Sequence, residues 1–147
     1  MLKAKKIVQN LLNEDLTDRL VMGFLYKKGK LSQITQWKLR WFFMLSEYNI
    51  RNQEDGRFLK FSELPEWVKT NTMYYFNPSG EDLAKGSVKV RQVKEIIMEV
   101  NQNPYKMIVK VGQEDGGERE YHLGSRYMIE IKKWENAINV IQGRFNE

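Results

Sequence analysis

The residues best suited to chemistry in this chain are basic side chains concentrated in one stretch near the N-terminus. Between Asp18 and Glu47 the sequence has no acidic residue. The basic residues of this stretch are Arg19, Lys27, Lys28, Lys30, Lys38 and Arg40. Lysine presents a compact positive charge and arginine a planar pair of donors, and both suit phosphate oxygens. The whole chain has a net charge of only +5, so this local excess predicts an anionic partner.

Other reactive side chains are scarce. The chain has no cysteine and a single histidine, His122. Thiol nucleophiles, disulfides, catalytic triads and Cys/His zinc sites are therefore excluded. The acidic residues form no recognisable acid/base pair. The acidic residues at 114–118 are interpreted as part of a turn and not as a cation site. We expect no enzyme activity, no cofactor and no metal site.

The composition is that of a single globular domain. The chain has 147 residues, of which 41% are hydrophobic and 29% charged, and this length suits one core. No apolar run approaches the roughly 18 residues that cross a bilayer, and residues 1–21 do not resemble a signal peptide. The absence of cysteine fits a reducing compartment, so we expect a cytoplasmic protein. Whether the native chain also carries an acylated N-terminal extension is left open.

Residues 1–21 are predicted to form an amphipathic helix that precedes a domain at 22–147. Apolar residues recur at three- and four-residue steps, and Gly23 is placed to end the helix. The stripe consists of Ile7, Val8, Leu11, Leu12, Leu16 and Leu20. Two interpretations stay open: the stripe packs on the domain, or it lies on a bilayer with Lys3, Lys5 and Lys6 beside it.

The following chain is rich in short β-strand patterns. We predict strands at Met22–Lys28, Trp37–Tyr48, Thr72–Phe76, Gly86–Val90, Ile96–Val100, Tyr105–Val111 and Glu118–Leu123. Residues 49–71 interrupt this series and are interpreted as an insertion with a short helix. A second amphipathic helix is predicted at Ser125–Arg144, with Ser125 as its N-cap. Many antiparallel strands closed by one helix predict a mainly β fold, a small barrel or sandwich.

The second predicted strand alternates with a period of two. Its odd-numbered residues are all apolar, and we expect them to face the core. They are Trp37, Leu39, Trp41, Phe43 and Leu45. Lys38 and Arg40 are then expected on the opposite face, outside the core.

Taken in order, these motifs resemble the pleckstrin-homology (PH) domain over roughly residues 22–145. The motif residues are Gly23, Phe24, Leu25 and Lys27, then Trp37, Lys38, Arg40, Trp41 and Phe42, then Tyr74 and Tyr75, then Gly86, Val88 and Val90, and finally Trp134. The whole chain also looks like the PH domains of the acylated PH proteins of apicomplexan parasites. The resemblance implies a seven-stranded antiparallel barrel or sandwich of two near-orthogonal sheets, closed by the C-terminal helix.

The resemblance also implies a ligand. Relatives that bind phosphoinositides contact the head group through residues that match Lys27, Lys38, Arg40 and Tyr75, and pairing of the first hairpin would bring Lys28 and Lys30 nearby. Phe76, Asn77 and Pro78 directly follow Tyr75, without the extra lysine or arginine of some relatives that bind highly phosphorylated lipids. Phosphatidic acid or a simple phosphoinositide is therefore favoured. Leu31 and Ile34 are candidates for a shallow membrane wedge, although Ile34 folding back onto the domain explains it equally well.

The expected function is a membrane-targeting module, peripheral on the cytosolic face of a membrane. A protein-interaction module on the same fold is the alternative, with a partner at the N-terminal helix, the insertion, an edge strand or the C-terminal helix. Nucleic-acid binding is disfavoured, because the alternation separates the aromatic side chains from the cations.

Overall fold

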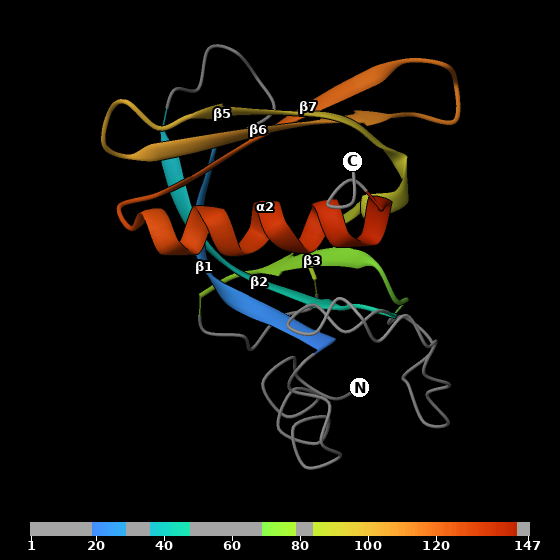
Figure 1. The fold of residues 1–147 in the computed structure, drawn as a ribbon, viewed down its shortest axis with the longest axis horizontal. Coiled ribbons are helices and arrows are strands. Elements are labelled where there is room, and N and C mark those ends of the chain that lie inside the picture. Colours follow the sequence, from blue (N-terminus) through green and yellow to red (C-terminus); the bar gives the residue numbers. More distant parts are fainter. Residues whose placement is uncertain (1–18, 29–35, 48–68, 79–83, 144–147) are drawn as a thin grey trace.

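The computed structural model describes residues 19–28, 36–47, 69–78 and 84–143. They form β1 (Leu20–Lys28), β2 (Trp37–Leu45), β3 (Thr72–Phe76), β4 (Gly86–Lys89), the short 3₁₀ helix η2 (Val90–Gln92), β5 (Val93–Glu99), β6 (Tyr105–Gly112), β7 (Glu118–Ser125) and the helix α2 (Met128–Gln142) (Figure 1). Among the described residues, no helix is long and apolar enough to cross a membrane. Most of the predicted N-terminal helix and most of the insertion lie outside the described residues.

All seven strands belong to one sheet, ordered β4-β3-β2-β1-β7-β6-β5. Each neighbouring pair is antiparallel. β1 and β7 pair only at Tyr26–Gly124 and Lys27–Leu123, so a narrow junction joins β1–β4 to β5–β7. The predicted mainly β fold of seven antiparallel strands and a closing helix is confirmed. The two sheets of the prediction are linked into one by this junction.

The closing helix fills the space between the two halves of the sheet. In Figure 1, α2 runs between the β5–β7 strands and the strands β2 and β3. It buries Ile131, Trp134, Ala137, Ile138 and Ile141 in a core shared with both halves, as its apolar stripe predicts. The helix ends where Gly143 adopts the left-handed conformation (φ 70°) and its N–H donates to Val140 O at 3.1 Å, a common termination for glycine.

Several strand ends differ by a few residues from the sequence prediction, and two of the differences concern the ends of the predicted helices. Leu20 and Val21, counted in the N-terminal helix, belong to β1, and Gly23 lies within that strand instead of ending a helix. Ser125 lies at the end of β7, and the N-cap of α2 is Tyr127. Ser125 still contributes to the turn, because its Oγ accepts a hydrogen bond from the Tyr127 N–H at 3.0 Å.

The prediction of the core-facing side of β2 was wrong. Phe42 and Met44 are the β2 residues in the main core cluster, so Lys38 and Arg40 share their face by alternation. Trp41 and Phe43 are also buried, but their rings pack on the opposite face with Phe76. Trp37 is half-buried and Leu39 is exposed. Because both faces of the second half of β2 are covered, apolar alternation could not identify the main core.

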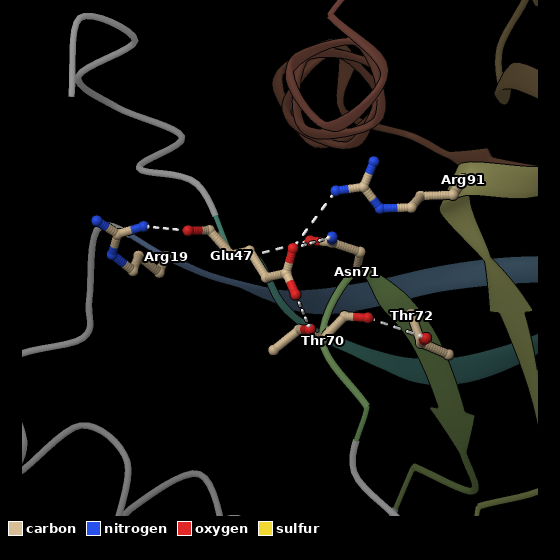
Figure 2. Close-up of polar contacts among 6 residues, drawn as sticks. All are labelled: Arg19, Glu47, Thr70, Asn71, Thr72 and Arg91. Atoms are coloured by element: carbon tan, nitrogen blue, oxygen red, sulfur yellow. Dashed lines mark hydrogen bonds and ion pairs between the residues drawn. The ribbon is translucent and has the colours of Figure 1, made fainter. Parts of the chain in front are cut away.

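A polar network joins the segment that follows β2 to the segment that precedes β3, on either side of residues 48–68 (Figure 2). The Glu47 carboxylate accepts hydrogen bonds from Thr70 Oγ1 at 2.9 Å and Asn71 Nδ2 at 3.1 Å, and Arg91 lies 3.4 Å away. The Glu47 N–H donates to Asn71 Oδ1 at 3.0 Å, and Arg19 donates to the Glu47 carbonyl. These contacts fix where β2 ends and β3 begins.

Asn71 is the residue of this network that we expect to be most sensitive to substitution. It is buried and adopts a left-handed conformation (φ 58°), which asparagine tolerates better than alanine. We expect Asn71→Ala to lower the free energy of unfolding by about 2–4 kcal/mol, through lost hydrogen bonds and backbone strain. Asn71→Gly loses the same bonds without the strain and should cost about 1 kcal/mol less. Urea unfolding measures both, and equal losses would rule out a contribution from the backbone conformation.

Candidate functional site

The two strands of the β1–β2 hairpin place cations at one end of the core. Val21 and Leu25 of β1 belong to the core, so Lys27 lies on the same face two residues later. Lys27 is opposite Lys38 in the register, and Leu25 is opposite Arg40. The hairpin therefore carries Lys27, Lys38 and Arg40 on its core-facing side, where the apolar packing ends.

Two tyrosine rings lie beneath Lys27. The Lys27 ammonium group is 5.0 Å from the centroid of the Tyr75 ring and 6.0 Å from that of Tyr121. Both rings are buried. Such distances allow cation–π attraction, so the rings of β3 and β7 hold the end of the lysine side chain without neutralising its charge.

Arg119 of β7 completes the arrangement. Its guanidinium carbon lies 4.4 Å from the centroid of the Tyr121 ring. We call Lys27, Lys38, Arg40, Arg119, Tyr75 and Tyr121 the cationic cluster. Sequence reasoning missed Arg119 and Tyr121, which follow the acidic turn at 114–118. The alternation of side chains along β7 was the available signal, because it places Arg119, Tyr121 and Leu123 on the same face of the strand.

Within the described residues, no carboxylate compensates the charges of the cationic cluster. Among the described residues, none of its four basic side chains forms an ion pair with an acidic group. The hydrogen bonds of Lys27 Nζ and Arg40 among the described residues go to neighbouring main-chain carbonyls, those of Lys28 at 3.5 Å and Leu39 at 2.9 Å. Burial, then the positive charges of Arg119 and Arg40, lowers the pKa of Lys27 below 10.5. An unpaired lysine in such surroundings favours the arrival of an anion.

Tyr121 adds a neutral donor beside these charges. Burial raises its pKa above 10.0, against the opposing effect of Arg119, so its hydroxyl stays protonated at neutral pH. Tyr121 and Arg119 also line an open cavity of about 450 Å³ between β4 and the β6–β7 turn. Acidic residues line the other side of this cavity, where Glu114 lies 3.8 Å from Lys89. The β6–β7 turn, which carries Glu114 and Asp115, therefore borders the cationic cluster.

A missing side chain on β4 makes room for Tyr75. Gly86 lies opposite Tyr75 in the register, and a Cβ at Gly86 would stand only 2.1 Å from the tyrosine hydroxyl. The Tyr75 ring therefore occupies the space above Gly86 and keeps its place under Lys27.

We expect Gly86→Ala to displace Tyr75 and to lower the free energy of unfolding by about 1–3 kcal/mol, as overpacking does. Thermal unfolding measures the loss, and Ser87→Ala on the exposed face of β4 is the matched control. The same Gly86→Ala change in a Tyr75→Ala background should cost almost nothing. A full cost in that background would contradict the steric explanation.

The predicted site residues separate into three groups. Lys27 lies opposite Lys38 in the register and over the Tyr75 ring, and Arg40 is near enough to lower the pKa of Lys27; that these residues bind a ligand stays a prediction. Lys28 pairs with Trp37 on the opposite face, with its ammonium group 4.8 Å from the centroid of the Trp37 ring. Lys30 and the candidate wedge residues Leu31 and Ile34 lie outside the described residues.

Comparisons with known proteins find similarity only among solved structures. No family model and no curated protein matches the sequence. One similar structure is the C-terminal PH domain of pleckstrin in complex with D-myo-Ins(1,2,3,5,6)P5. It is 18% identical, with a TM-score of 0.49, and the match covers 83% of this chain and 93% of that chain. Another is the PH domain from TgAPH, 12% identical with a TM-score of 0.47, which covers 97% of this chain and 93% of that one. Seven antiparallel strands and a C-terminal helix, which the sequence resemblance implies, are seen directly in this chain.

Proposed function

We propose that this protein is a peripheral membrane-targeting module that binds the phosphate of an anionic phospholipid in the cationic cluster. The observation that carries the proposal is the position of Lys27 over two tyrosine rings, with Arg119 beside one ring and Arg40 nearby, while none of the three has a carboxylate partner among the described residues. Three strands contribute these cations, so a phosphate there receives donors from several directions. Lysine supplies point charges and arginine a planar fork, which together match a tetrahedral anion.

Simple electrostatic attraction does not account for stable membrane residence. Each basic residue near an anionic leaflet contributes about 1 kcal/mol. The four cations of the cluster therefore give about 4 kcal/mol, an affinity near the millimolar range. A defined head-group site must add to this attraction. In the proposal Tyr75 and Tyr121 provide its floor, Lys30 approaches from the β1–β2 connection, and Leu31 and Ile34 form a shallow wedge.

A lipid with one phosphomonoester suits this cluster best. Beyond Tyr75 the chain continues with Phe76, Asn77 and Pro78, which carry no cation for a second or third phosphate. Phosphatidic acid exposes a single phosphomonoester, and a monophosphorylated inositide carries one on its ring. We therefore propose phosphatidic acid or such an inositide as the ligand, on the cytosolic face of a membrane.

Vesicle sedimentation across a lipid panel tests the proposal. The panel compares phosphatidic acid, phosphatidylserine and phosphoinositides at matched net charge, with phosphatidylcholine as the neutral reference. We expect pelleting to require anionic lipid and to fall for Lys27→Ala and Arg40→Ala, whereas Lys132→Ala on the exposed side of α2 should change little. Equal pelleting with neutral vesicles, or identical pelleting of all three variants, would refute the proposal.

The pH dependence of binding should report Lys27. Its pKa lies below 10.5 in the folded protein, so its charge is lost at a lower pH than that of an ordinary lysine. Vesicle binding is then expected to weaken as the pH rises through that lowered value, and Lys27→Arg should move the decline to higher pH. The ligand titrates identically for both proteins, so the difference isolates residue 27. Folding stability should change in the opposite direction, because deprotonation removes an unfavourable buried charge.

A protein-interaction module remains the second candidate, and one observation favours it. An open groove of about 410 Å³ lies between β1 and the start of α2. Its lining includes Phe24 and Leu39, which are 47% and 37% exposed, and Tyr127, which is 69% exposed. An extended apolar peptide would fit such a surface. Phe24→Ser should leave vesicle pelleting unchanged if lipid binding is the function of the cationic cluster.

A further inference from the structure

β1 and β7 separate near the start of α2, and part of the β1 edge is left without a neighbouring strand. The pairing of the two strands is confined to Tyr26–Gly124 and the position that follows it along β1. Main-chain groups of every second residue point to the same edge of an antiparallel strand. Phe24 lies between Tyr26, which pairs with β7, and Met22, whose carbonyl accepts a hydrogen bond from Lys133 Nζ of α2 at 2.7 Å. The Phe24 N–H and carbonyl therefore point to the same side, into the gap between β1 and β7.

This stretch of the β1 edge is unpaired. In the described part of the chain, no hydrogen bond joins the Phe24 main chain to β7, to the turn after it or to α2. An open N–H and carbonyl on a strand edge are the groups to which an extended peptide adds. Lys133 and Glu130 close the gap at one end, where a Cβ at Gly23 would lie 3.1 Å from Lys133 Nζ and 2.7 Å from Glu130 Oε2. The open edge is therefore a short segment centred on Phe24.

The groove of about 410 Å³ between β1 and α2 surrounds this open edge. Its exposed apolar lining consists of Phe24, Leu39 and Tyr127. Lys133 and Glu130, which also line it, lie 2.8 Å apart and compensate each other. Arg126 is a further lining residue, and within the described ranges it forms no ion pair with a carboxylate. The groove thus combines an apolar wall with an uncompensated positive charge.

We propose that this groove binds an extended peptide that pairs with the β1 edge at Phe24 and carries an apolar residue next to an acidic one. The main chain of the peptide hydrogen-bonds to Phe24, its apolar side chain packs on Phe24 and Leu39, and its carboxylate pairs with Arg126. Because the groove is positively charged, a basic peptide is disfavoured. The inference rests on the second candidate function, the protein-interaction module, and assigns it a partner chemistry and a mode of binding.

The first test selects binders from a phage-displayed library of randomised seven-residue peptides on the immobilised protein. We expect enrichment of sequences in which an apolar residue stands beside aspartate or glutamate. Arg126→Glu should shift the enrichment to lysine and arginine. The matched control is Lys132→Glu, which makes the same change of charge on α2 outside the groove and should leave the acidic preference intact. A failure to enrich any sequence, or a preference that Arg126→Glu does not alter, would overturn the proposal.

A synthetic copy of the most enriched peptide then locates the contact. By nuclear magnetic resonance, the Phe24 amide hydrogen should exchange rapidly with solvent in the free protein and slowly in the presence of saturating peptide. In fluorescence polarisation, Phe24→Ser should weaken peptide binding about tenfold and Arg126→Ala about fivefold. Thermal unfolding shows that both variants stay folded. A peptide that binds without slowing the exchange of the Phe24 amide would contradict pairing with the β1 edge.

Vesicle sedimentation separates this inference from lipid binding. Phe24→Ser should lose the peptide and pellet like the wild type with vesicles that contain phosphatidic acid. If the wild-type protein pellets with no anionic vesicle, the lipid proposal fails, and the peptide selection still decides whether the groove binds a partner. If folded Phe24→Ser loses vesicles and keeps the peptide, the groove is not the peptide site and the inference is overturned.

Discussion

Replacing Lys27 and Arg119 together with methionine is expected to weaken binding to vesicles that contain phosphatidic acid by about thirtyfold. Each cation near an anionic surface contributes about 1 kcal/mol, and 1.4 kcal/mol corresponds to a factor of ten. The double variant should not unfold at a lower temperature than the wild type. Burial and the charge of Arg119 already disfavour the charged form of Lys27, so methionine removes an unfavourable charge and keeps the length of the side chain.

The experiment is specific because the double change is expected to weaken vesicle binding without lowering the unfolding temperature. Sedimentation or surface plasmon resonance gives the affinity, and calorimetry gives the unfolding temperature. The control is the double change Lys94→Met and Lys132→Met, which removes the same charge from exposed positions on β5 and α2. If the control weakens binding as much as the test variant, binding depends only on net charge. If the test variant loses binding because it unfolds, the cations support the fold and not the ligand.

The largest effect on stability is expected for Trp134→Ala, which should lower the free energy of unfolding by about 3–5 kcal/mol. Trp134 is fully buried, and its ring lies edge-on to Phe42 with centroids 6.0 Å apart. It stands in the middle of α2 and joins the helix to the β1–β4 half of the sheet. Trp134 is the largest fully buried side chain among the described residues of α2, so the cavity left by alanine would be large.

Trp134→Phe separates packing from hydrogen bonding. The indole Nε1 of Trp134 is buried with no hydrogen-bond partner among the described residues, so phenylalanine sacrifices no polar contact. We expect this variant to cost below about 1.5 kcal/mol. Ile129→Ala, at a 75% exposed position of the same helix, should cost below about 0.5 kcal/mol. Chemical denaturation measures all three variants, and a Phe variant as unstable as the Ala variant would contradict a cavity as the cause.

The strands and the closing helix were predictable because each carries a local signal. Thr72–Phe76 was predicted with its exact bounds, since a short run of residues that favour β-strands precedes a turn. The stripe of α2 correctly placed Ile131, Trp134, Ile138 and Ile141 in the core. The start of β1 was misplaced, because Leu20 continues the spacing of a helical stripe and also begins a strand.

The orientation of β2 could not be obtained from the pattern of its residues. From Trp41 to Leu45 every residue is apolar and buried, so both faces look like a core. The deciding information is the pairing of Phe42 with Tyr75 and of Met44 with Met73, which is a property of the assembled sheet. Lys38 and Arg40 therefore belong to the core-facing side, contrary to the prediction.

The cationic cluster was half predictable for a related reason. Lys27, Lys38 and Arg40 are neighbours in a hairpin of short sequence separation, so their proximity follows from local pairing. Arg119 is far from them in sequence and sits among Glu118 and Glu120, which hide it in any count of local charge. Only the contact of β1 with β7 brings Arg119 to Lys27.

The network around Glu47 and Asn71 has a consequence for how this protein can vary. Its hydrogen bonds fasten the exit from β2 to the entry into β3, so the sheet does not depend on the length of chain between them for that alignment. Doubling the length of a loop costs only about 0.6 kcal/mol of closure entropy. The connection between β2 and β3 is therefore a suitable insertion site, where sequence can be added, exchanged or fused while the sheet keeps its structure.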